Sequence, residues 1–99
     1  MSRTYYTDYV RHALRFYTRH NTQPSFKSDV DKSNWLSCQS VFKKYSKKDV
    51  DILMSIYSGY DTLADEVYNA CKKHNIEQNQ VWDMMKDVER QIARRRGLV

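Results

Sequence analysis

Residues 76–96, IEQNQVWDMMKDVERQIARRR, decide how this chain folds. At about 100° per residue on a helical wheel, four apolar side chains of this stretch share a narrow sector: Val81, Met85, Val88 and Ile92. The opposite side of the wheel is polar and basic, with Asn79, Asp83, Lys86, Arg90 and Arg94. Gly97, a residue type that often ends a helix, comes just after the stretch. The pattern predicts a long amphipathic helix with one core-facing stripe.

The composition favours a single all-α domain. The chain has 99 residues, of which 40% are hydrophobic and 13% aromatic, enough for one compact core. Only 2 Gly and 1 Pro are present, too few for the turns of a many-stranded sheet. We therefore expect one domain over residues 1–99, a compact bundle of about five helices. Residues 1–45 would form an N-terminal helical segment and residues 46–99 the remainder.

Capping residues and a loop-forming stretch predict where the helices begin and end. Three pairs have the spacing of a capping box, in which each side chain satisfies a backbone N–H of the first helical turn: Ser28 with Asp31, Ser46 with Asp49, and Thr62 with Asp65. They predict helices from residue 28 to about residue 45, from residue 46 to a close at residues 58–60, and over residues 62–75. A first helix is expected from Thr4 to Arg19, followed by a loop over residues 21–27.

Helical spacing also assigns the core. In the first helix the expected core face comprises Tyr6, Tyr9, Val10, Ala13, Leu14 and Tyr17. The central core residues predicted from the other helices are Trp35, Phe42, Leu53, Val67, Val81, Met85 and Val88. Cys38, Tyr45 and Cys71 are placed on core faces as well, so both cysteines are interpreted as small buried hydrophobic residues.

Several classes of function are not expected. No nucleophile–base pair or glycine-rich phosphate loop is present, so an enzyme is the least favoured class. Cys71 and His74 supply only two ligands at helical spacing, so neither a metal nor another cofactor is expected. No apolar run approaches the ~20 residues of a membrane span, and the first residues include arginines where a signal peptide is apolar. With two widely spaced cysteines, these features predict a cytoplasmic protein without a membrane partner.

The net charge of +5 is unevenly distributed. Residues 1–48 hold 10 Lys/Arg against 3 Asp/Glu, residues 49–85 hold 2 against 7, and residues 86–99 hold 5 against 2. Basic ends therefore flank an acidic middle. Within the first helix, Arg11, Arg15 and Arg19 form a row, interpreted as a solvated flank in preference to a nucleic-acid surface.

The second half of the chain has the order of a helix-turn-helix, because two predicted helices are joined by a short turn at residues 75–77. Residues 46–98 resemble region four of bacterial sigma factors and the small sigma-like regulators of phages and mobile elements. The matching features are a capped helix with Ile-Tyr near its end, a small residue four before the turn, Ile76 after it, and Val81 five further on. Asn75, where glycine is usual, and Trp82, where a basic residue is frequent, depart from that pattern. The first half, including FKSDVDKSNWLSC, is similar to the leading segment of the phage-type proteins.

The resemblance implies a transcriptional regulator that binds double-stranded DNA with its last helix in the major groove. Its base-contacting residues would be Gln78, Asn79, Gln80 and Asp83, and its phosphate-contacting residues Lys86, Arg90, Arg94 and Arg95. Two alternatives stay open. These side chains could be an ordinary solvated helix face, or the chain could be a protein-binding module that docks on RNA polymerase or a host defence protein without touching DNA. The sequence does not decide the oligomeric state.

Overall fold

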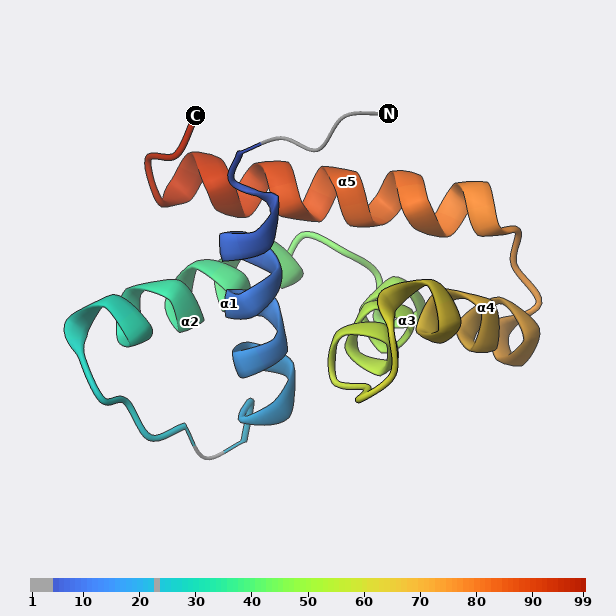
Figure 1. Ribbon diagram of the computed structural model, residues 1–99, viewed down its shortest axis with the longest axis horizontal. Coiled ribbons are helices and arrows are strands. Elements are labelled where there is room, and N and C mark those ends of the chain that lie inside the picture. The colour runs from blue at the N-terminus through green and yellow to red at the C-terminus, as the bar shows by residue number, and fades with distance from the viewer. Residues whose placement is uncertain (1–4, 23) are drawn as a thin grey trace.

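The computed structural model describes residues 5–22 and 24–99, which fold into five helices (Figure 1). These are α1 (Thr7–Arg19), α2 (Asp29–Phe42), α3 (Lys47–Tyr57), α4 (Leu63–His74) and α5 (Gln78–Arg95). The described residues contain no strand, so the predicted all-α class with about five helices is confirmed. In Figure 1, α5 runs along one side of the molecule, with α3 and α4 near its first half and α1 and α2 near its second half. The long final helix therefore packs against both parts of the chain.

Three helix starts are the ones that the capping boxes predicted. The side-chain oxygens of Ser28, Ser46 and Thr62 accept hydrogen bonds from the backbone N–H groups three residues later, at 3.2, 3.2 and 3.3 Å. Each bond satisfies a donor that the first turn of a helix leaves without an intrahelical partner. The start of α5 differs, because its N-cap residue Glu77 makes no capping hydrogen bond with its side chain. The predicted start of the first helix at Thr4 lies outside the described residues.

The second helix is shorter than predicted. It ends at Phe42, and the next residues tighten into a turn in which the N–H of Tyr45 donates to the carbonyl of Phe42 at 3.2 Å. Tyr45 is consequently not on the core face of α2. Its ring is half-buried, and its hydroxyl donates to a carboxylate oxygen of Asp87 in α5. The phenol needs a polar partner for its hydroxyl, and α5 supplies one that helical spacing within residues 28–45 could not reveal.

The predicted central core is confirmed. Its seven residues are all buried, together with further side chains such as Leu14, Ile52 and Ile56. Among the other core-face assignments, Tyr9 is wrong, whereas Tyr6 and Cys71 are partly buried against the core. Tyr9 is 43% exposed, because its hydroxyl exchanges hydrogen bonds with the Asn34 side chain at the edge of the interface between α1 and α2. Cys71 is only partly buried and packs against the margin of the core.

The turn between α4 and α5 depends on one residue with a left-handed backbone. Asn75 ends α4 with a φ of 52°, a conformation that asparagine tolerates better than most residues with a side chain. The N–H of Ile76 then reaches back to the carbonyl of Cys71 at 3.2 Å, the bond of a Schellman-type helix end. The expectation that Asn75 can replace the usual glycine is confirmed. The turn delivers the chain directly into α5.

Candidate nucleic-acid interface

A buried carboxylate fixes the middle of α5 against two other helices. Glu89 is only 4% exposed, and its Oε2 accepts hydrogen bonds from Arg11 Nε of α1 at 3.0 Å and from the Tyr57 hydroxyl of α3 at 2.6 Å. Burial, followed by the nearby Glu89 charge, raises the pKa of Tyr57 well above its ordinary value of 10.0. This contact was not predicted from the sequence. The available signal was the wheel position of Glu89, about 80° from Val81 and thus beside the apolar stripe.

The arginine row of α1, interpreted from the sequence as a solvated flank, makes hydrogen bonds within the protein: Arg11 and Arg15 are partly buried, and Arg19 is exposed. Arg15 Nη1 donates to the Gly59 carbonyl at 3.0 Å, and Arg19 Nη2 donates to the same oxygen at 2.7 Å. Arg19 also lies over the ring of Tyr60, 4.1 Å from its centroid. Carbonyls just after a helix lack intrahelical donors, so the end of α3 offers acceptors to this row. Together with the Arg11–Glu89 ion pair, these bonds turn the row toward the protein.

The exposed side of α5 carries a row of polar and basic side chains. The residues of this outward row are Asn79, Asp83, Lys86, Arg90 and Arg94, all exposed. Gln78 and Gln80, also exposed, lie about 100° to either side of Asn79. All eight residues that the resemblance implicates in DNA contacts are therefore on one helix and exposed, although Arg95 lies about 100° around the helix from Arg94 and so outside the outward row.

Three of the four implicated phosphate-contacting residues surround one hollow. An open hollow of about 310 Å³ is lined by Lys44, Asp87, Arg90, Gln91, Arg94 and Arg95. Lys86 is exposed but does not line it. Lys44 comes from the connection between α2 and α3 and was not assigned a role from the sequence. The hollow therefore unites cations from two segments that are far apart in the chain.

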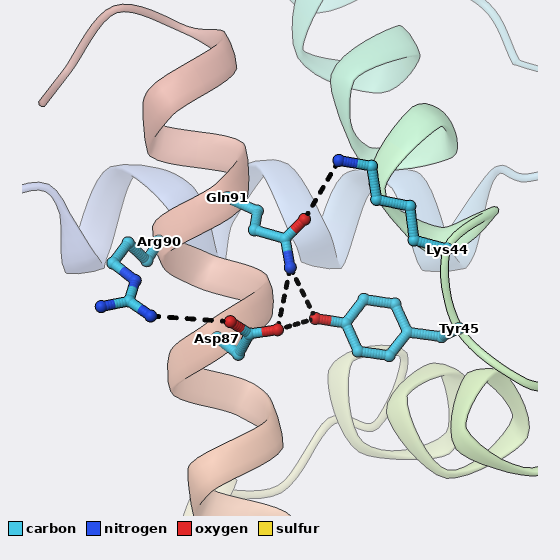
Figure 2. Close-up of polar contacts among 5 residues, drawn as sticks. All are labelled: Lys44, Tyr45, Asp87, Arg90 and Gln91. Carbon is cyan, nitrogen blue, oxygen red and sulfur yellow. Dashed lines mark hydrogen bonds and ion pairs between the residues drawn. The ribbon is translucent and has the colours of Figure 1, made fainter.

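Hydrogen bonds hold that connection against α5 (Figure 2). The Tyr45 hydroxyl donates to Asp87 Oδ2, while Gln91 Nε2 lies 2.8 Å from the same oxygen and 3.0 Å from the Tyr45 hydroxyl oxygen. Lys44 Nζ donates to Gln91 Oε1 at 3.4 Å, and Arg90 Nη2 lies 3.7 Å from Asp87 Oδ1. The hydrogen bond from Tyr45 lowers the pKa of Asp87, and the bond from Gln91 adds to this effect. Asp87 therefore acts as an ionised anchor for the basic side chains around it.

The three arginines at the end of the long helix have different surroundings. Arg96 is half-buried, and its Nε donates to Asn34 Oδ1 of α2 at 2.6 Å. Arg94 and Arg95 are exposed and make no hydrogen bond or ion pair within the described part of the chain. Arg96 therefore joins α5 to α2. Arg94 and Arg95 remain accessible to a ligand.

The surroundings of the two cysteines do not favour a reactive thiolate or a metal site. Cys38 is fully buried, and burial raises the pKa of its thiol to about 12, which disfavours the reactive thiolate. Burial also raises the pKa of the Cys71 thiol. Over residues 5–22 and 24–99, no group of three or more His, Cys, Asp or Glu side chains is placed to hold a metal ion. Within the same residues, no helix has the length and apolar character needed to cross a membrane.

Comparison with known proteins adds no relative. A scan of protein-family models and searches of curated proteins and solved structures found no match. The resemblance to sigma region four thus rests on the spacing of residues within this chain.

Proposed function

We propose that this chain is a DNA-binding transcriptional regulator of the phage or mobile-element type, and that α5 is its recognition helix. The observation that carries the proposal is the outward row of α5, which has Asn79 near its start and Arg90 and Arg94 near its end. Amides that can read bases are therefore followed, along one accessible helix face, by cations that can hold phosphates.

The helix and its approach fit this use. α5 follows α4 after a three-residue turn, the succession of a helix-turn-helix. Its 18 residues extend about 27 Å, more than twice the ~12 Å width of the major groove. Only the first part of the helix would enter the groove, where Asn79 or Gln80 could bond bidentately to adenine and Asp83 could accept from cytosine N4. The remainder would lie along the sugar-phosphate backbone.

The test compares base contacts with phosphate contacts on a duplex selected by the protein from random sequences. Asn79→Ala and Gln80→Ala should each weaken binding to the selected duplex by about 1–3 kcal/mol and leave binding to random duplexes nearly unchanged. Arg94→Ala should weaken binding to both duplexes and reduce the slope of log affinity against log salt by about one. Fluorescence anisotropy at two salt concentrations measures both effects.

Asn21→Ala is the matched control, because Asn21 is an exposed amide of the connection between α1 and α2. Figure 1 shows that this connection lies away from the start of α5. It should bind both duplexes as the unmodified chain does. The proposal fails if Asn79→Ala and Gln80→Ala retain the full preference for the selected duplex.

A protein-binding module is the second candidate, favoured by two exposed aromatic rings. Tyr60 is 85% exposed and Tyr68 52% exposed, and both belong to the acidic α3–α4 part of the chain, beside Asp61 and Asp65. Tyrosine is enriched in protein interfaces, so RNA polymerase or a host defence protein is the partner class that this surface would suit. Under this alternative, the double variant Tyr60→Ala/Tyr68→Ala should no longer capture the partner, and the unmodified chain should bind no duplex at low salt.

A further inference from the structure

A basic segment covers the connection between α2 and α3 and the first two residues of α3, and it had no function assigned from the sequence. Residues 43–48, KKYSKK, contain four lysines, and each of them is exposed: Lys43, Lys44, Lys47 and Lys48. Six consecutive residues with four cations are typical of a surface that attracts a polyanion. A run of lysines alone is also common on solvated surfaces, so its position in the fold determines whether it can act with other groups.

The fold places this segment beside the second half of α5. Tyr45 and Lys44 bond directly to Asp87 and Gln91, which follow one another by a single helical turn on α5. Lys44 consequently shares the 310 Å³ hollow with the cations of α5, and the other three lysines flank the same anchored residues in the chain. The two basic segments are thus held together by the Tyr45–Asp87–Gln91 hydrogen bonds (Figure 2).

The carboxylates of these segments do not cancel the cations. Asp87 accepts from Tyr45 and Gln91 and lies near Arg90, and Glu89 is buried against Arg11 on the other side of α5. Asp49 and Asp51 are on the first turns of α3. Against these four carboxylates stand seven cations, namely Lys43, Lys44, Lys47, Lys48, Arg90, Arg94 and Arg95. The surface around the hollow is therefore net positive.

We propose that the lysines of residues 43–48 and the arginines Arg90, Arg94 and Arg95 form one composite site for the phosphate backbone of nucleic acid, spanning the hollow. This inference rests on the proposed function and adds a second chain segment to the DNA contact. The outward row of α5 leads toward the hollow, so a backbone followed from Asn79 would reach Arg90 and then the lysines. Exposed lysines act on phosphates as point charges without reading bases, so the segment would supply affinity and not sequence preference.

The test removes three of the lysines and keeps Lys44, which is hydrogen-bonded to α5. In the variant Lys43→Ala/Lys47→Ala/Lys48→Ala, the slope of log affinity against log salt should become shallower by about 0.9 for each phosphate that the variant no longer neutralises. Affinity for selected and random duplexes should fall by the same factor, so the ratio between them should stay constant. Fluorescence anisotropy over a series of salt concentrations gives both quantities.

The control variant Lys27→Ala/Lys32→Ala/Lys73→Ala removes the same charge from exposed positions elsewhere on the surface and should retain the slope. Circular dichroism melts verify that both triple variants fold, and glutamine replacements at the same positions provide a second set. If the unmodified chain binds duplexes but the two triple variants have equal slopes, the composite site is wrong and the proposed function stands. If the unmodified chain binds no duplex at low salt, both are wrong.

Discussion

At the scale of single residues, Glu89 is the polar group on which the packing of α5 most depends. It is the shared acceptor for Arg11 and Tyr57, so one side chain joins α1, α3 and α5. A buried ion pair adds little stability compared with apolar packing, but removal of one partner leaves the other without compensation. The ion pair therefore matters most through the cost of breaking it.

We predict that Glu89→Leu lowers the free energy of unfolding by about 3 kcal/mol, because Arg11 and the Tyr57 hydroxyl lose their acceptor. The side chain of Arg11 is 24% exposed, so water can compensate part of the loss. The double variant Arg11→Met/Glu89→Leu should recover some of the stability, since it removes the unpaired charge. Urea denaturation of both variants, with the exposed Glu77→Leu as control, measures the difference. Equal stabilities of the single variant and the control would contradict the prediction.

Because the pKa of Tyr57 is raised in the folded chain, we predict that the free energy of unfolding depends on pH in the alkaline range. Its pKa in the folded chain is well above 10.0, so the unfolded chain loses this proton first as the pH rises. The contribution of Tyr57 is fully present below pH 10.0 and declines as the pH rises toward the pKa of the folded state. Tyr57→Phe should be less stable at neutral pH but lose less stability above pH 10.0. Urea denaturation of the unmodified chain and of Tyr57→Phe below and above that pH tests the prediction. An equal decline of the free energy of unfolding in the two proteins would contradict it.

At the scale of the elements, helix starts and core faces could be predicted because they depend on residues close in sequence. Ser28, Ser46 and Thr62 each bond to a backbone group three residues away. The contacts that could not be predicted join distant segments. Tyr45 meets Asp87 across 42 positions, and Arg15 meets Gly59 across 44. Spacing within a helix indicates which face is apolar, but it does not specify which polar groups on neighbouring helices become partners.

The turn between α4 and α5 provides the test at this scale, because Asn75 adopts a φ of 52°. Asn75→Val should lower the free energy of unfolding by about 1–2 kcal/mol, since a β-branched side chain is strained in the left-handed region. Asn75→Gly should be tolerated, as glycine has no Cβ to clash. Thermal melts compare the two variants. If valine and glycine had the same effect, the turn would not depend on this conformation.

At the scale of the whole molecule, the two ends of α5 differ in electrostatic environment. The first half belongs with the acidic α3–α4 region and carries Asp83 and the preceding Glu77, whereas the second half adjoins the basic segment 43–48. Acidic groups near the proposed base-reading residues oppose phosphate approach, and the basic end must offset them. The candidate base contacts could be named from the sequence, since they lie on one helix. The hollow could not be predicted from the sequence, because Lys44 is brought to α5 only by the fold.

Selection from a library of random duplexes at low salt tests the central proposal most directly. The unmodified chain should enrich one short motif, and the double variant Asn79→Ala/Gln80→Ala should lose preference at particular base pairs of that motif while still retaining duplexes through its basic end. The contrary result is that repeated rounds enrich no motif with the unmodified chain, or that both proteins enrich the same motif equally well. Either outcome would show that α5 does not read DNA bases with these residues.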